Sequence, residues 1–252
     1  MENDDRPVGH VLTRRELLAA LGATGFVILT RCSRPDAARS EGAAALAVGD
    51  STFSGCVVRP QQTEGPYFVD EMLNRADVRS DPTNGVVKPG ALLSLNFHVS
   101  RLDDKACTPI AGAVVDIWHC DHVGVYSDVE DPGFDTTGQK FLRGYQVTDA
   151  DGAARFTTIY PGWYAGRTVH IHFKIRSEPS ADRGFEFTSQ LYFPDELTDQ
   201  VHAQEPYAAK GPRTVRNERD GIYRRDGSQL LLAVEPRDEG YAATFDIALQ
   251  GV

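Results

Sequence analysis

The 252-residue chain has no excess of positive charge, no long hydrophobic run and no paired-cysteine motif. Its 26 Lys and Arg face 36 Asp and Glu, so binding to nucleic acid or to an acidic membrane surface has no electrostatic support. The absence of Cys-x-x-Cys argues against a thiolate metal site, and the absence of Gly-x-Ser-x-Gly leaves a serine hydrolase without support. The chemistry of this otherwise ordinary globular composition must come from other side chains.

The N-terminal segment has the features of an export signal. Thr13-Arg14-Arg15-Glu16-Leu17-Leu18 is a twin-arginine pattern, and the apolar run that follows ends at Thr30, short of the roughly 20 residues that span a bilayer. We predict a signal segment over residues 1–32, a disordered linker over 33–52, and export to the periplasm or the extracellular space. An amphipathic surface helix is one alternative, and membrane anchoring through a half-formed lipoprotein site at Cys32 is another.

Three cysteines, Cys56, Cys107 and Cys120, lie in the body of the chain. In an oxidising space we expect one disulfide with one cysteine left over, and all three pairings are open. Cys120 is expected in a disulfide rather than as a catalytic group.

Hydrophobic and polar residues alternate along several segments, as in half-buried strands. The inward sets are Leu93, Leu95, Phe97 and Val99; Ala113, Val115 and Ile117; and Tyr241, Ala243, Phe245, Ile247 and Leu249. Turn signals such as Asp103-Asp104, Asp149–Gly152 and Arg225–Gly227 separate the strands, and the N-terminal segment has the only strong helical pattern. We predict one all-β domain over residues 53–252, an antiparallel β-sandwich with long loops that carry the functional site.

The segment Tyr164–Phe173 combines a tyrosine, an arginine and two histidines. On a strand, His170 and His172 share one face, while Ile171, Phe173 and Ile175 share the other. Two neutral imidazoles on one sheet face can bind a metal ion, whereas a pair of exposed strand histidines is the alternative.

Three other segments, taken together with Tyr164–Phe173, resemble one known protein family. They are Pro60–Phe68, Gly112–Asp121 with Gly124–Ser127, and Phe141–Tyr164. In order and spacing the four blocks resemble the intradiol ring-cleavage dioxygenases, the group of the protocatechuate 3,4-dioxygenases and catechol 1,2-dioxygenases, over roughly residues 56–250. The closely spaced Trp118 and Tyr126 are part of this resemblance.

The resemblance implies a ferric iron and assigns roles to particular residues. The iron ligands would be Tyr126, Tyr164, His170 and His172. Arg167 would stabilise negative charge on the substrate, and Gln190 would be the active-site glutamine. The substrate pocket would be lined by Thr63, Gly65, Pro66 and Trp118, while His119 and His122 flank the Tyr126 loop in structural or supporting roles.

The implied reaction inserts both atoms of O2 into a catechol-type aromatic diol and yields a cis,cis-muconate-type diacid. A donor set of two phenolates and two imidazoles suits Fe(III) better than Zn(II) or Cu(I). The diol would displace Tyr164, which then helps to take up a proton. A small aromatic diol and O2 are thus the expected partners, and a homodimer is a further option.

The chain also departs from the family pattern. Only five residues separate Tyr164 from His170, and Ala165-Gly166 replaces the usual Pro-Trp, so the pocket wall is altered. No long helical N-terminal dimerisation segment is evident, which favours the compact, exported branch of the family. One alternative is a cupin-like or zinc hydrolase, but the chain has no third histidine and carboxylate at the regular spacing that such a site needs. The other is a secreted β-sandwich binding module without catalysis, associated with aromatic compounds or lignocellulose.

Overall fold

The computed structural model describes residues 56–104, 106–178 and 184–252. The predicted signal segment, the predicted linker and the first three residues of the predicted domain lie outside these ranges. Within them, no helix is long and apolar enough to cross a membrane.

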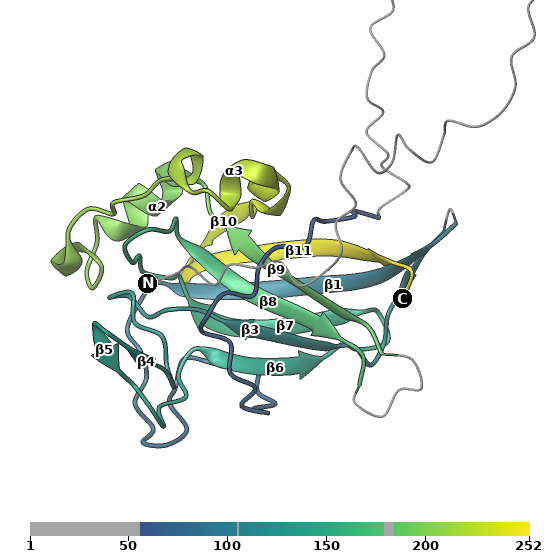
Figure 1. Ribbon diagram of the computed structural model, residues 1–252, viewed down its shortest axis with the longest axis horizontal. Helices are drawn as coiled ribbons and strands as arrows, with labels where there is room; N and C mark the ends of the chain where they lie inside the picture. The colour runs from purple at the N-terminus through teal and green to yellow at the C-terminus, as the bar shows by residue number, and fades with distance from the viewer. Residues whose placement is uncertain (1–55, 105, 179–183) are drawn as a thin grey trace, which may run out of the picture. The chain divides into compact units, whose positions relative to one another are not determined.

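Two β-sheets form the body of the protein (Figure 1). In the first sheet β1 (Leu92–Asp103) is central: β11 (Gly240–Gln250) pairs with one edge, and β7 (Ala153–Ile159) and β2 (Ala106–Pro109) also pair with β1, while β10 (Val234–Arg237) extends β11. The second sheet has the order β6 (Arg143–Val147), β3 (Val114–Trp118), β8 (His170–Arg176), β9 (Glu186–Tyr192). A small hairpin of β4 (Glu130–Asp131) and β5 (Phe134–Asp135) stands apart.

The predicted β-sandwich is confirmed, with one exception to the antiparallel arrangement. The strands β1 and β11 run parallel, with Leu93 opposite Tyr241, while the other strand pairs of the two sheets are antiparallel. The alternating pattern predicts which face of a strand is buried, but it does not specify the direction of the neighbouring strand.

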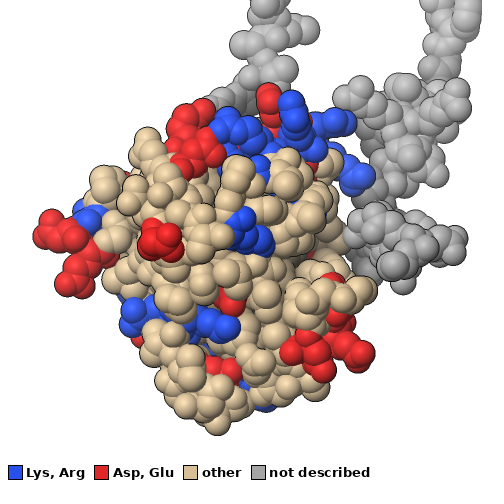
Figure 2. Space-filling view, turned by 90° about the vertical axis from the view of Figure 1, so that its left-hand side faces the viewer, with Lys and Arg blue, Asp and Glu red and all other residues tan. Residues whose placement is uncertain are grey.

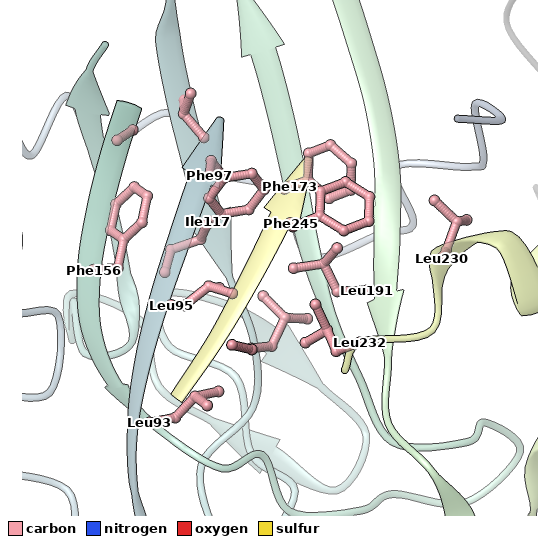
Figure 3. Close-up of a cluster of buried hydrophobic side chains, with 14 of the residues drawn as sticks. Leu93, Leu95, Phe97, Ile117, Phe156, Phe173, Leu191, Leu230, Leu232 and Phe245 are labelled. Carbon is pink, nitrogen blue, oxygen red and sulfur yellow. The ribbon is translucent and has the colours of Figure 1, made fainter. Parts of the chain in front are cut away.

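The core lies between the two sheets and is built from the alternating strand residues (Figure 3). Phe97 of β1 has no exposed surface, and its ring centroid lies 5.4 Å from that of Phe173 on β8. Phe173 in turn lies 5.4 Å from Phe245 on β11. Each such side chain contributes roughly 1.5–3 kcal/mol when it is fully buried. The inward faces of β1, β8 and β11 therefore join the sheets.

Short helices between β9 and β10 were not predicted from the sequence. They are α2 (Asp195–His202), α3 (Tyr223–Asp226) and the 3₁₀ turns η1 (Ala208–Lys210), η2 (Asn217–Arg219) and η3 (Gly227–Leu230). Helices this short are marginal alone and depend on tertiary contacts. One such contact is the Arg213 side chain, which donates to carboxylate oxygens of Asp195 and Asp199. The predicted turn at Arg225–Gly227 falls at the junction of α3 and η3.

The cysteine pairing corrects one expectation. Cys56 and Cys107 form a disulfide, while Cys120 is a buried free thiol. The chain at Val57 lies along β11, since Ala248 N donates to Val57 O, and this places Cys56 near the β1–β2 hairpin. Cys120 follows β3 in the other sheet and packs beside Trp118 and Tyr126, so it was wrongly expected in a disulfide.

Charged side chains of both signs are interspersed on the face shown in Figure 2, with broad uncharged areas between them.

Candidate metal centre and active site

The two histidines of β8 point toward each other on the outer side of the second sheet. Ile171, Phe173 and Ile175 share one face of the strand, as predicted, and this face enters the core, which leaves His170 and His172 on the opposite face. Each histidine is 1% exposed, and their Nε2 atoms are 3.0 Å apart. Because β8 is paired on both edges, the backbone of the two histidines is rigidly placed.

Two tyrosines from separate loops complete the cluster. Tyr126, in the loop after β3, has its Oη 3.5 Å from His170 Nε2. Tyr164, in the loop before β8, has its Oη 3.2 Å from the same atom. Tyr126 is 1% exposed, whereas Tyr164 is partly exposed. The four residues predicted as ligands therefore meet in space, with Tyr164 on the accessible side.

Both imidazoles are held in the neutral form that binds metal ions. Burial lowers the pKa of His170 to about 3, and burial together with His170 lowers the pKa of His172. The Nδ1 of His170 lies 2.6 Å from the carbonyl oxygen of Thr168. Since a carbonyl only accepts, Nδ1 carries the proton and the Nε2 lone pair faces the tyrosines.

The two phenols need a cation in order to ionise. Burial raises the pKa of Tyr126, and the neighbouring Tyr164 raises it further; burial is also the main cause of the raised pKa of Tyr164. A bound metal ion reverses this preference, because it is the largest local charge in such a site.

The donor set fits ferric iron. In the described part of the chain, no three or more His, Cys, Asp or Glu residues are grouped so as to hold a metal ion. A site at His170 and His172 must therefore use the phenols, and the hydrolase alternative finds no third histidine or carboxylate there. Two imidazoles with two phenolates favour a hard, highly charged ion such as Fe(III).

Arg167 and Gln190 form one hydrogen-bonded unit beside the cluster. The Nη2 of Arg167 donates to Gln190 Oε1 at 2.5 Å, and Gln190 Nε2 donates to Thr63 O at 2.9 Å. Gln190 lies opposite His172 in the sheet and is fully buried, whereas the Arg167 side chain is 17% exposed. Arg167 is thus the member of the pair that a bound molecule can reach.

The segment predicted to line the pocket lies against His172. A Cβ on Gly65 would be 3.2 Å from His172 Cε1, and Gly65 has a φ of +74°, which favours glycine. Thr63 Oγ1 accepts from Gly65 N at 3.3 Å, and Pro66 is exposed. Gly65 thus lies next to His172, with Thr63 and Pro66 close to it in the chain.

Trp118 supports His172 from the buried side. The two rings are nearly parallel, 8° apart, with centroids separated by 5.0 Å, and Phe68 packs on Trp118 at 4.8 Å. With 1% exposure, Trp118 contacts the histidine rather than an open pocket surface.

His119 has hydrogen-bond partners at both ring nitrogens, which fits the structural role that was one of the two expected for it. Its Nδ1 lies 2.8 Å from Cys120 O and its Nε2 lies 2.7 Å from Thr158 Oγ1, so neither nitrogen is available to a metal ion. Burial lowers the pKa of His119 to about 4.

Sequence reasoning missed several residues that support the site. Tyr67 stacks on Tyr126, with 4.5 Å between ring centroids, and its hydroxyl donates to Asp131 Oδ2 at 2.7 Å. The buried Arg143 donates to the carbonyl oxygens of Ser127 and Tyr67 at 3.0 and 2.7 Å, which ties the Tyr126 loop to this ring. Both residues lie in the segments that match the family, but nothing local singles them out.

The fold and the site define a β-sandwich protein with a buried centre of two histidines and two tyrosines. The family model for dioxygenases matches residues 63–251. The chain belongs to the intradiol ring-cleavage dioxygenase family and is an oxidoreductase of that type.

Individual relatives agree with this assignment. The chain is 30% identical over 197 residues to the beta chain of protocatechuate 3,4-dioxygenase from Burkholderia cepacia, which covers 74% of this chain and 77% of that one. It is 30% identical over 145 residues to catechol 1,2-dioxygenase 1 from Acinetobacter lwoffii; this match covers 47% of the chain but spans only 42% of that relative.

Solved structures show the same likeness over most of the described residues. The intradiol ring-cleavage dioxygenase from Tetranychus urticae superposes with a TM-score of 0.68 at 28% identity, covering 78% of this chain and 96% of that one. The dioxygenase domain of a dioxygenase carbohydrate-binding protein fusion from Streptomyces sp. SirexAA-E is 32% identical, with a TM-score of 0.54 and coverage of 77% and 99%.

Proposed function

We propose that this protein is a non-haem Fe(III) dioxygenase that inserts both atoms of O2 into a catechol-type aromatic diol. The ring would be cut between the two hydroxyl-bearing carbons to give a cis,cis-muconate-type product. The observation that carries the proposal is the placement of three further donor atoms, those of His172, Tyr164 and Tyr126, at 3.0, 3.2 and 3.5 Å from His170 Nε2.

Tyr126, Tyr164, His170 and His172 would hold the iron. When bound, the ferric ion supplies the Lewis acidity that activates an aromatic diol toward O2. The protein supplies the rigid β8 platform, the buried surroundings and the two phenols that match the charge of the ion.

Tyr164 is the residue best placed to take a proton from the diol. It is the more exposed of the two tyrosines, and it lies in a loop rather than on a strand. Burial raises the pKa of its phenol, so the neutral form is favoured once Tyr164 leaves the metal ion. Tyr164 Oη would accept the proton of one diol hydroxyl as the diol takes its place.

Arg167 would stabilise the negative charge that develops on the substrate. Its guanidinium is held by two partners and is partly exposed beside the cluster. A pre-oriented positive charge in a water-poor site favours the transition state without reorganisation, and removal of one such donor typically costs roughly 10²–10³ in kcat.

The direct test is to purify the protein from iron-replete cells and to measure iron, visible absorption and O2 uptake. We expect near-stoichiometric iron, a reddish tyrosinate-to-Fe(III) charge-transfer band, and intradiol products from at least one diol. Tyr126→Phe and His172→Ala should lose the band and the activity together, whereas Tyr145→Phe, a partly exposed tyrosine of β6, is the matched control. Iron-free, colourless wild-type protein would instead favour the non-catalytic binding module.

The identity of the diol depends on the loop between Tyr164 and His170. Ala165 and Gly166 are exposed and carry little side chain, which supports an open pocket wall at this point. The substrate panel should contain catechol, hydroxyquinol, protocatechuate and lignin-derived aryl diols. An enzyme with an open wall should accept ring substituents there, and a sharp preference for unsubstituted catechol would contradict this.

We also propose that the protein is exported through the twin-arginine pattern at Arg14 and Arg15. The disulfide between Cys56 and Cys107 supports this, because such bonds persist in oxidising compartments. Replacement of Arg14 and Arg15 by lysine should retain the protein in the cytoplasm, as cell fractionation would show. The homodimer stays a prediction that analytical ultracentrifugation can test.

A further inference from the structure

Asp220 is a fully buried carboxylate outside the proposed ligand set. Its Oδ2 accepts hydrogen bonds from Arg167 Nε and from the backbone N–H of Thr168, both at 2.8 Å. Its Oδ1 accepts from the backbone N–H groups of Ile222 and Tyr223 at 2.8 and 3.0 Å. The carboxylate therefore joins the start of α3 to the loop that carries Arg167.

These bonds restrict the orientation of the Arg167 guanidinium. The group is planar and carries five N–H donors. Asp220 holds Nε and Gln190 holds Nη2, so two of its three nitrogens are bound to partners in different elements. No hydrogen-bond partner of Nη1 is found within the described ranges. A group held on one edge in this way presents its remaining donors in a defined direction.

The backbone next to Arg167 is held by the same helical segment. Besides the bond from Thr168 N to Asp220, Thr168 Oγ1 donates to Asn217 Oδ1 at 2.7 Å, and Asn217 Nδ2 donates to Phe193 O at 2.9 Å. The segment between β9 and β10 thus anchors both the side chain and the main chain at this point of the loop.

Asp220 is charged despite its burial. Burial alone would raise its pKa, but Arg167 and the backbone N–H of Thr168 together hold the pKa of Asp220 below its ordinary value. Removing Arg167 would leave the buried Asp220 carboxylate without its ion-pair partner, which is costly.

We propose that Asp220 is a positioning residue for the ring-cleavage reaction: it orients the Arg167 guanidinium toward the bound diol. This inference rests on the proposed dioxygenase function. Asp220 is fully buried and contacts Arg167, so it acts through Arg167 rather than on the diol itself. Loss of the orientation should lower turnover, because a guanidinium free to rotate must be ordered again in each transition state.

The test is a double-mutant cycle of Asp220→Asn and Arg167→Ala in the iron-loaded full-length protein. For Asp220→Asn we expect roughly a 10–100-fold loss of kcat on the best diol of the wild type, with KM changed by less than about threefold. Iron content and the visible band should match the wild type. In the Arg167→Ala background the same change should have no further effect on kcat, because no guanidinium is left to orient. Glu218→Gln, at an exposed carboxylate of η2, is the control and should retain wild-type kcat.

Two results would overturn the proposal: full kcat in Asp220→Asn, or equal losses in both backgrounds, which would indicate a general structural role. If Asp220→Asn yields no soluble protein, Asp220→Glu keeps the charge but displaces the oxygens, and it enters the same cycle with the same expected non-additivity. A wild-type protein that binds no iron and consumes no O2 would refute the proposed function itself, a different outcome from either of these.

Discussion

Replacing Cys56 and Cys107 by serine removes a covalent link across 51 positions of the chain. A crosslink stabilises mainly by restricting the unfolded chain, by an amount that grows with the size of the closed loop. For a loop of this size the chain-entropy relation gives about 14 cal/mol/K, or about 4 kcal/mol at 25 °C. Because small domains are stable by about 5–15 kcal/mol, this loss is a large share of the total.

The assay is urea unfolding of the iron-loaded protein, followed by far-UV circular dichroism. We expect the free energy of unfolding to fall by about 4 kcal/mol in the double variant, with a similar loss in each single variant, since either one opens the loop. His170 and His172 lie on the other sheet, so the visible band and kcat of the folded variant should be unchanged.

A loss below about 1 kcal/mol would refute the loop-entropy reasoning. It would mean either that the unfolded chain stays restricted without the bond, or that the segment at Cys56 comes away from the sheet once the bond is cut, despite the pairing of Val58 with Ala248. A loss of the visible band in the folded variant would refute the independence of the two sheets.

Three further predictions concern the site and its supports. Gly65→Ala places a Cβ 3.2 Å from His172 Cε1 at a φ of +74°, so it should lower the free energy of unfolding by about 1–2 kcal/mol and shift the visible band. The control is Gly85→Ala, which is also at positive φ but has open space around it, so it should lower stability without shifting the band. Burial raises the pKa of Asp116 to about 6, so the folded state favours the protonated acid and loses about 3 kcal/mol of stability as pH rises from about 4 to 6. Asp116→Asn should remove this pH dependence from the free energy of unfolding measured in urea. A difference from the wild type that does not change with pH would contradict the prediction. Removing iron with a chelator should abolish the visible band. Rebinding ferric ion, supplied as a soluble chelate near neutral pH, should ionise the neutral phenols of Tyr126 and Tyr164 and give the ultraviolet difference spectrum of tyrosinate; no such difference would show that the phenols are not ligands.

Local patterns predict much of this fold. The alternation along β1 and β8 places Phe97 and Phe173 in the core, and the same alternation places His170 and His172 together on the opposite face. The period of a strand is two residues, so a few consecutive positions are enough to assign each side chain to a face. The helices between β9 and β10 have no comparable pattern, because their stability comes from contacts such as those of Arg213.

The sequence by itself determined the β-sandwich, its core residues, the family and the four side chains that meet at the candidate metal site. Only the tertiary structure decided that Cys56 pairs with Cys107, that β1 and β11 run parallel, and that Asp220 holds Arg167. Arg167 and Asp220 are 53 positions apart, on a loop and a short helical segment with no shared periodicity. Such contacts follow from the way distant segments pack onto the sheets, and no local pattern encodes them.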